Sequence, residues 1–84
     1  MSSNPARPEI EKALQSELAV ILDLPESRIA VDTPLENLGL DSIRLMEIIV
    51  FIEKKYGINL IDAGLNQETM KDISSLAKLV SDSL

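Results

Sequence analysis

The 84-residue sequence contains no cysteine and no histidine. Without cysteine, the chain can form no disulfide, no thiolate metal site and no cysteine nucleophile. Without histidine, it lacks the commonest general base and the commonest metal ligand, so Ser-His-Asp chemistry within this chain is impossible. These absences favour a binding or carrier module over an enzyme, and they disfavour a small hydrolase in particular.

Aromatic residues are almost as scarce: they make up 2% of the sequence, and Phe51 and Tyr56 are the two that it contains. Hydrophobic residues still reach 45%, which is enough for one domain with a modest core. That core must consist of Leu, Ile, Val, Met and Ala, and Leu, Met and Ala favour helix. We therefore expect an all-α fold: a small bundle of three main helices, with a long loop between the first two and a short helical turn before the third.

Long apolar runs and excess positive charge are also missing. The longest nearly unbroken apolar stretch, residues 45–52, is too short to span a bilayer and contains Glu47. The N-terminus has no apolar segment of the kind that a signal peptide needs. A formal net charge of −6 argues against binding to nucleic acid or to an anionic membrane, and it suits docking to basic patches on other proteins. We expect a cytoplasmic monomer.

Helical periodicity divides the first half of the chain. Residues 1–6 are small and polar, and we expect them to be disordered and residues 7–84 to form the domain. Pro8 suits the first position of a helix, which continues with apolar residues at three- and four-residue steps until Pro25 stops it. The long connection that follows, residues 24–40, contains five apolar residues that can anchor it to the core. They are Ile29, Val31, Leu35, Leu38 and Leu40.

Within this connection, Thr33 can cap a single short turn that has Pro34 at its first position. The second helix is predicted to begin at Asp41 or Ser42 and to end at Gly57, which suits a left-handed C-terminal cap. This helix is apolar on most of its circumference. It is therefore either central to the bundle or uses its outer face for a partner.

The last third of the sequence predicts a loop around Gly64 and a final helix. One short helical turn is expected at residues 62–65. Thr69 followed by Asp72 resembles a capping box, with Asp in place of the usual Glu, and it predicts where the third helix starts. The apolar residues of that helix recur at helical spacing: Ile73, Leu76, Ala77, Val80 and Leu84.

The segment most informative about function surrounds Ser42. Asp41 can cap the second helix, which leaves Ser42 in the first turn. A phosphate on that hydroxyl would lie against free backbone N–H groups at the positive end of the helix dipole. Gly39 allows a sharp turn and a close approach by a second macromolecule. These features also suit the ordinary start of a helix, so on their own they do not decide between the two interpretations.

The stretch Leu-Gly-Leu-Asp-Ser-Ile at residues 38–43 resembles the attachment motif of the phosphopantetheine-dependent carrier proteins. This family includes acyl carriers and the aryl or peptidyl carriers of nonribosomal synthesis, and the resemblance covers roughly residues 8–82. It implies that a phosphopantetheinyl transferase, which binds Mg²⁺, moves 4′-phosphopantetheine from coenzyme A to Ser42. Asp41 is then expected to help engage the transferase. The terminal thiol of the arm holds the cargo as a thioester, and the carrier itself needs no metal.

The same resemblance implies further partners: an adenylating ligase or acyltransferase that loads the arm, and condensing or transfer enzymes downstream. The residues expected to dock these partners are Leu40, Ile43, Arg44, Leu45, Met46 and Glu47. Some of them have plainer interpretations. Leu45 and Met46 suit the core equally well, and Arg44 is also explained as a solvated residue that pairs with a neighbouring side chain.

Charge separates the subfamilies of carriers. Residues 41–56 contain three acidic and three basic residues, so the net charge of −6 divides into −4 in residues 1–40 and −2 in residues 57–84. Arg44 departs from fatty-acid carriers, in which an acidic residue is common at this place, and residues 39–46 are similar to the aryl carriers of siderophore pathways. We expect a discrete carrier of nonribosomal-peptide or polyketide type. The alternatives are a carrier of fatty-acid synthesis and a helical interaction module without a prosthetic group.

Overall fold

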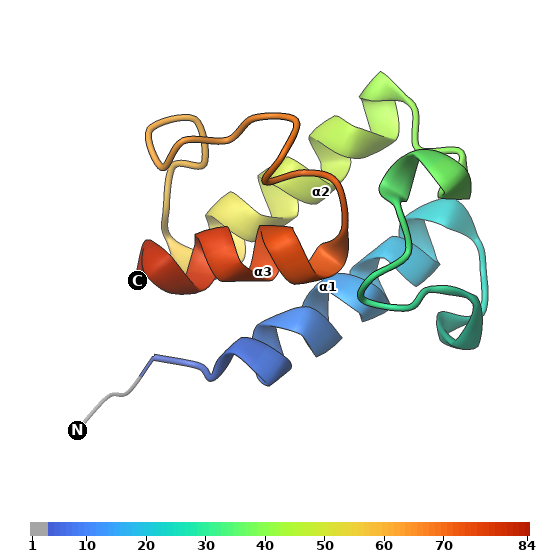
Figure 1. The fold of residues 1–84 in the computed structure, drawn as a ribbon, viewed down its shortest axis with the longest axis horizontal. Coiled ribbons are helices and arrows are strands. Elements are labelled where there is room, and N and C mark those ends of the chain that lie inside the picture. Colours follow the sequence, from blue (N-terminus) through green and yellow to red (C-terminus); the bar gives the residue numbers. More distant parts are fainter. Residues whose placement is uncertain (1–3) are drawn as a thin grey trace.

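α1 is the helix against which the other two main helices pack (Figure 1). The structure is a computed structural model that describes residues 4–84. Its elements are, in order, α1 (Arg7–Leu22), the 3-10 turns η1 (Glu26–Arg28) and η2 (Leu35–Leu38), α2 (Ser42–Tyr56) and α3 (Ile73–Asp82). Residues 4–84 contain no strand, and the all-α prediction is therefore confirmed. The expected disorder of residues 1–6 is not tested, since residues 1–3 lie outside the described part.

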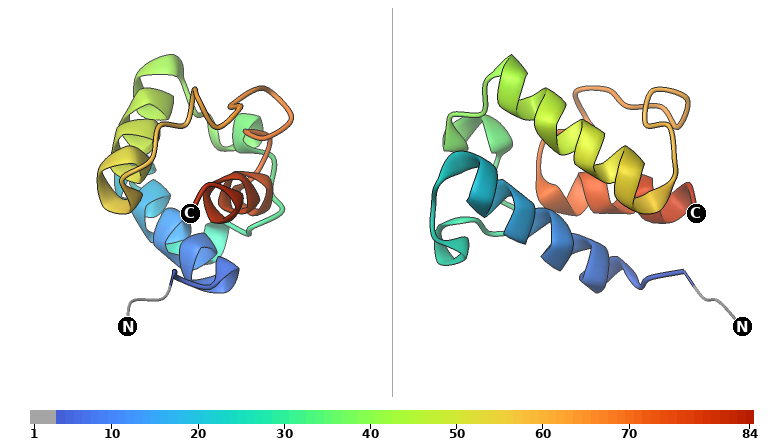
Figure 2. Two further views of the ribbon diagram at one scale, coloured as in Figure 1. Left: turned by 90° about the vertical axis from the view of Figure 1, so that its left-hand side faces the viewer. Right: turned by 180° about the vertical axis from the view of Figure 1, so that it is seen from behind.

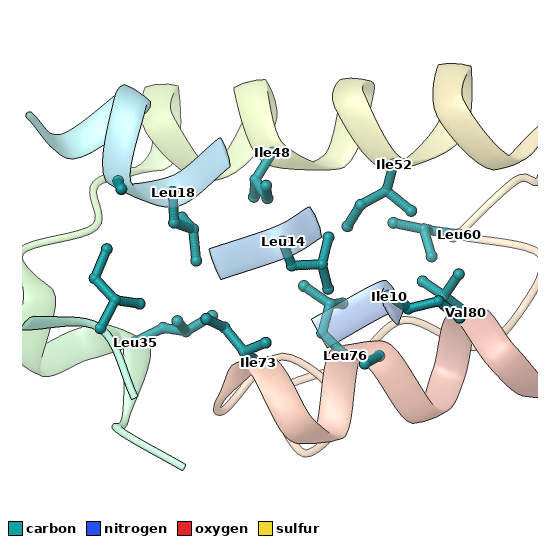
Figure 3. Packing of buried hydrophobic residues seen from close by; sticks show 13 residues of the cluster. Ile10, Leu14, Leu18, Leu35, Ile48, Ile52, Leu60, Ile73, Leu76 and Val80 are labelled. Atoms are coloured by element: carbon teal, nitrogen blue, oxygen red, sulfur yellow. The ribbon is translucent and has the colours of Figure 1, made fainter. Parts of the chain in front are cut away.

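An aliphatic core joins the three helices. Ile48 and Ile52 point from α2 toward Leu14 of α1, as Figure 3 shows. Full burial of one such side chain contributes roughly 1.5–3 kcal/mol, and ten Leu, Ile and Val side chains are essentially inaccessible to solvent. As the composition predicts, neither aromatic ring is fully buried. The buried cluster consists of Ile10, Leu14, Leu18, Ala19, Ile29, Leu35, Ile48, Ile52, Leu60, Ile73, Leu76, Ala77 and Val80.

α1 ends through a left-handed residue and not at a proline. Asp23 has a φ of 54°, and the N–H of Leu24 donates to the Ala19 carbonyl at 3.0 Å. This is the Schellman arrangement, which aspartate tolerates better than most side chains other than glycine. Pro25, the stop that the sequence predicts, lies beyond the turn that has already ended the helix.

The connection between α1 and α2 is more structured than the sequence predicts. It contains two 3-10 turns in place of the single expected one, and Pro34 directly precedes η2 instead of lying at its first position. The prediction that Thr33 caps this turn is wrong, because no side chain caps it. The five predicted anchors do pack on the core, with Ile29 and Leu35 buried and the other three partly buried.

Hydrogen bonds hold this connection against α3 and α1. The N–H of Leu35 donates to the Lys71 carbonyl at 2.8 Å, and the N–H of Ser74 donates to the Val31 carbonyl at 2.8 Å. On the side of α1, the Gln15 side-chain amide donates a hydrogen bond to the backbone carbonyl of Ile29. Both neighbours of the loop therefore fix the position from which α2 begins.

α2 is not the central helix of the bundle. α2 and α3 both pack on α1, and α2 forms one side of the molecule (Figures 1 and 2). Only Ile48 and Ile52 of α2 are fully buried. The sequence predicts that this apolar helix is either central to the bundle or uses its outer face for a partner. The structure excludes the central position and leaves the outer face uncovered.

The start of α3 differs from the predicted capping box. Asp72 itself is the N-cap, and its carboxylate accepts a hydrogen bond from the Ser75 N–H at 2.7 Å. Thr69 instead exchanges hydrogen bonds with Asn66 at 2.8 and 3.0 Å. The helical turn predicted at residues 62–65 is also wrong, because residues 60–64 form hydrogen-bonded turns and no helix.

The end of α3 matches its predicted apolar stripe except at Leu84, which lies beyond the helix and is exposed.

Within residues 4–84, no helix is both long enough and apolar enough to cross a membrane.

Candidate functional site

The backbone turns into α2 over three residues. Gly39 ends η2 with a φ of 76°, a left-handed conformation that a side chain rarely adopts. Nothing lies within 4 Å of the place where a Cβ would stand, so the glycine is required by its dihedral angle and not by crowding. Asp41 is extended and forms the N-cap, and Ser42 is the first residue of the helix. These positions are the ones that the sequence predicts.

Asp41 holds the first turn of α2 in two ways. Its Oδ1 accepts a hydrogen bond from the Arg44 N–H at 2.8 Å, and its Oδ2 lies 3.1 Å from Arg44 Nη1 in an ion pair. The backbone hydrogen bond from Arg44 is the main cause that lowers the pKa of Asp41, and the guanidinium charge lowers it further. Asp41 is therefore ionised at neutral pH, with a cation beside it.

Ser42 is exposed at the end of α2 where the helix dipole is positive. The first N–H groups of a helix have no partner within it, and they favour an anion at this end. The negative charge of Asp41 would oppose a phosphate on Ser42, but the ion pair with Arg44 offsets that charge. The site can thus accommodate a phosphodiester on the hydroxyl of Ser42.

The six residues predicted to dock partners do not share one environment. Four of them are exposed, and they are Ile43, Arg44, Met46 and Glu47. Leu40 and Leu45 are instead partly buried and pack against the core. The core interpretation therefore holds for Leu45, whereas Met46 faces solvent. Arg44 is exposed and pairs with a neighbouring side chain, as its plainer interpretation has it, and that neighbour is Asp41.

An apolar groove begins at Ser42 and follows the outer face of α2. It is lined by Glu17, Ser42, Ile43, Met46, Glu47 and Val50. Two of these residues were missed by sequence reasoning. Val50 could have been found, because it continues the spacing of Ile43 and Met46. Glu17 could not, since only the packing of α1 against α2 brings it to the groove.

Side chains that could hold a metal ion do not gather anywhere in the described chain. Within residues 4–84, no group of three or more His, Cys, Asp and Glu side chains is placed to bind one.

Most of the chain matches a known protein family. The family model described as "Phosphopantetheine attachment site" matches residues 12–81. The acyl carrier protein of Onion yellows phytoplasma is 43% identical over 58 residues, which cover 67% of this chain and 76% of that protein. A phenolphthiocerol/phthiocerol polyketide synthase polypeptide of Mycobacterium tuberculosis is 36% identical over 83 residues. This match covers 96% of the chain but only 4% of that synthase polypeptide.

Proposed function

Because this chain belongs to the family of phosphopantetheine carrier domains, we propose that Ser42 is the residue to which its prosthetic arm is attached. The chain is a carrier and not an enzyme, and its prosthetic group is 4′-phosphopantetheine. One observation supports Ser42 above all. It is an exposed serine at the first position of a helix, directly after the N-cap Asp41, and it lies within the matched residues.

The surroundings of Ser42 suit the group. The phosphodiester would lie at the positive end of α2, and Arg44 offsets the charge of Asp41 beside it. The exposed hydroxyl leaves room for a transferase to approach, and Gly39 keeps the preceding turn free of a side chain. The arm, once attached, supplies a terminal thiol on which an acyl, aryl or aminoacyl group is held as a thioester. No thiol of the chain competes with it, since the chain has no cysteine.

The exposed residues near Ser42 are the proposed docking surface for partner enzymes. Asp41 is proposed to engage the phosphopantetheinyl transferase. Ile43, Arg44, Met46 and Glu47 offer apolar and charged contacts to the enzymes that load and unload the arm. Leu40 and Leu45 support this surface from below, because both pack partly on the core.

We infer that the carrier serves specialised biosynthesis of nonribosomal-peptide or polyketide type. An adenylating ligase or acyltransferase would load the arm, and condensing or transfer enzymes would receive the cargo. Two observations support this: the zero net charge of residues 41–56, and the similarity of 96% of the chain to part of a polyketide synthase. The 43% identity to an acyl carrier protein favours fatty-acid synthesis as the second candidate.

The attachment site is tested by mass spectrometry of the intact protein after incubation with coenzyme A, Mg²⁺ and a broad-specificity transferase. The wild type should gain the mass of one arm, and Ser42→Ala should gain none. Ser75→Ala is the matched control, because Ser75 also lies in the first turn of an aspartate-capped helix. It should be modified like the wild type. A helical interaction module without a prosthetic group predicts instead that the wild type stays unmodified.

The type of carrier is tested with the modified protein and a panel of loading enzymes. Adenylating ligases supplied with amino or aryl acids, a polyketide acyltransferase and a malonyl transferase of fatty-acid synthesis would each be offered the carrier at equal concentration. Specialised biosynthesis predicts faster loading by an adenylating ligase or by the polyketide acyltransferase than by the malonyl transferase. Preferential loading by the malonyl transferase would favour the second candidate.

A further inference from the structure

One ridge of α2 joins the proposed attachment serine to a lysine. The ridge consists of residues that follow one another at steps of four, the spacing at which side chains of a helix are neighbours: Ser42, Met46, Val50 and Lys54. All four are exposed, and the first three also line the groove on the outer face of α2. An arm on Ser42 therefore has an uncovered path along the helix to the amine of Lys54.

The arm is long enough to bring an acyl group to that amine. Lys54 follows Ser42 by twelve residues, which is about 18 Å along an α-helix. Helical side chains lean toward the N-terminus of their helix, so the long side chain of Lys54 can bring its Nζ about one turn, or about 5 Å, closer to Ser42. From the serine oxygen to the carbonyl carbon of a thioester, the arm has the length of about five residues of extended chain, or about 17 Å. The carbonyl carbon and the amine can therefore meet without any movement of the helix.

The other lysines are not placed in the same way. Lys55 is next in the chain, but it belongs to another side of α2. Its Nζ lies 5.9 Å from the centre of the Tyr56 ring, in a pocket that Glu9 of α1 also lines. The three remaining lysines lie outside α2, and one of them, Lys78, is held in an ion pair on α3. None of the ion pairs within residues 4–84 includes Lys54, so its amine is both in line with the arm and without a competing carboxylate.

The transfer of an acyl group along this ridge needs nothing beyond the loaded arm and water. The ammonium of Lys54 gives a proton to water, and the resulting amine attacks the carbonyl carbon of the thioester. The C–S bond breaks, an amide C–N bond forms, and the thiolate of the arm takes up a proton from water. Tethering favours this reaction, because two groups of one chain that are held within reach meet at a high effective concentration. The acyl group ends on Lys54, and the thiol of the arm is free again.

We propose that Lys54 is an acyl acceptor for the arm of its own chain, and that a loaded carrier left without a partner enzyme transfers its acyl group from the thiol to this lysine. The inference rests on the proposed attachment at Ser42. It adds a modification site at the far end of the ridge, with acyl thioesters as the class of substrate. Formation of the amide removes the positive charge of Lys54, so the modified carrier presents one cation fewer on the outer face of α2.

The test is mass spectrometry of the full chain in its hexanoyl form. The transferase loads the chain from hexanoyl coenzyme A, the remaining coenzyme A is removed, and the protein is incubated without partner enzymes. Neutral hydroxylamine then cleaves thioesters and leaves amides intact. The wild type should retain the hexanoyl mass in a fraction that grows with time, and peptide sequencing should place the group on Lys54. The rate should be the same at different protein concentrations, because the transfer occurs within one chain.

Two matched variants test the position of the acceptor. Lys54→Arg keeps the positive charge and removes the amine nucleophile. It should lower the hydroxylamine-resistant fraction at least about tenfold, because the reaction then loses its tethered partner. Lys55→Arg makes the same change one residue away and should leave that fraction unchanged. Both lysines are exposed, and circular dichroism should show the same helicity for the two variants and the wild type.

Three results would overturn the acceptor. The first is complete removal of the hexanoyl group by hydroxylamine at every time of incubation. The second is an amide on another lysine in equal or greater amount. The third is a rate that rises with protein concentration, which would indicate transfer between molecules. Failure of the attachment is seen separately, because the wild type would then gain no arm at the loading step. The measurement therefore distinguishes a wrong acceptor from a wrong attachment site.

Discussion

The two faces of α2 contain the same kinds of side chain and are covered differently. The inner face presents Ile48 and Ile52, which are fully buried against α1 and the rest of the core (Figure 3). The outer face presents Ile43, Met46 and Val50, which remain 41–71% exposed. Both rows are apolar, so composition does not distinguish them. They differ because α1 covers only one side of α2.

This difference separates stability from function within one helix. The inner row contributes to the folding free energy because it removes apolar surface from water. The outer row contributes little to folding, since it remains hydrated, and an exposed apolar row beside the proposed attachment serine indicates binding. Replacing a residue of the inner row should therefore mainly lower stability. Replacing a residue of the outer row should mainly impair the carrier function.

The largest expected effect comes from Ile52→Ala, set against Val50→Ala two residues away. Ile52 is fully buried, and its truncation should lower the free energy of unfolding by about 2–5 kcal/mol. Val50→Ala should change it by less than about 0.5 kcal/mol, because surface substitutions have small effects. Urea unfolding followed by circular dichroism measures both. Equal losses from the two variants would show that the outer face also stabilises the fold.

The next effect concerns a helix start that is remote from the carrier site. Asp72 caps α3 through its 2.7 Å hydrogen bond from Ser75, and Asp72→Ala should lower the free energy of unfolding by about 1 kcal/mol. It should not alter modification of Ser42. Asp82→Ala removes an exposed ion pair at the other end of α3 and should change stability by at most about 0.5 kcal/mol. Loss of modification in the Asp72 variant would couple the cap of α3 to the carrier face.

Arg44→Asp reverses a charge on the outer side of α2. Arg44 is exposed and pairs with Asp41 at the surface, so its replacement should change the free energy of unfolding by no more than about 0.5 kcal/mol. It should change kcat/KM of the transferase or of a loading enzyme several-fold, because like charges then gather beside Ser42. Lys78→Asp makes the same charge change on α3 and should leave these rates unaltered. Loss of helicity in Arg44→Asp would show that this residue is structural.

Much of this organisation can be predicted from the sequence, because it depends on local chemistry. The bounds of α2 follow from Asp41, which caps its start, and from Gly57, which ends it with a φ of 66°. The family follows from the motif around Ser42. The errors lie where distant contacts decide. No local pattern shows that α1 covers only one side of α2, or that Glu17 reaches the groove. Asp23 likewise ends α1 through backbone bonds that compete with the more obvious signal of Pro25.

The smallest expected effect is a titration that compares the two faces directly. The backbone N–H of Arg44, and to a lesser extent its guanidinium, hold the pKa of Asp41 below its ordinary value. The cap therefore stabilises the folded chain fully above the ordinary aspartate pKa, and its contribution is lost as the pH falls through the lowered one. NMR should show the Arg44 amide and the Ile43 methyls titrating with that low midpoint, while the Ile52 methyls stay unchanged. Arg44→Ala should raise the midpoint only partly, because the backbone hydrogen bond remains. A midpoint at or above the ordinary value, or a matching change at Ile52, would contradict the separation of the two faces.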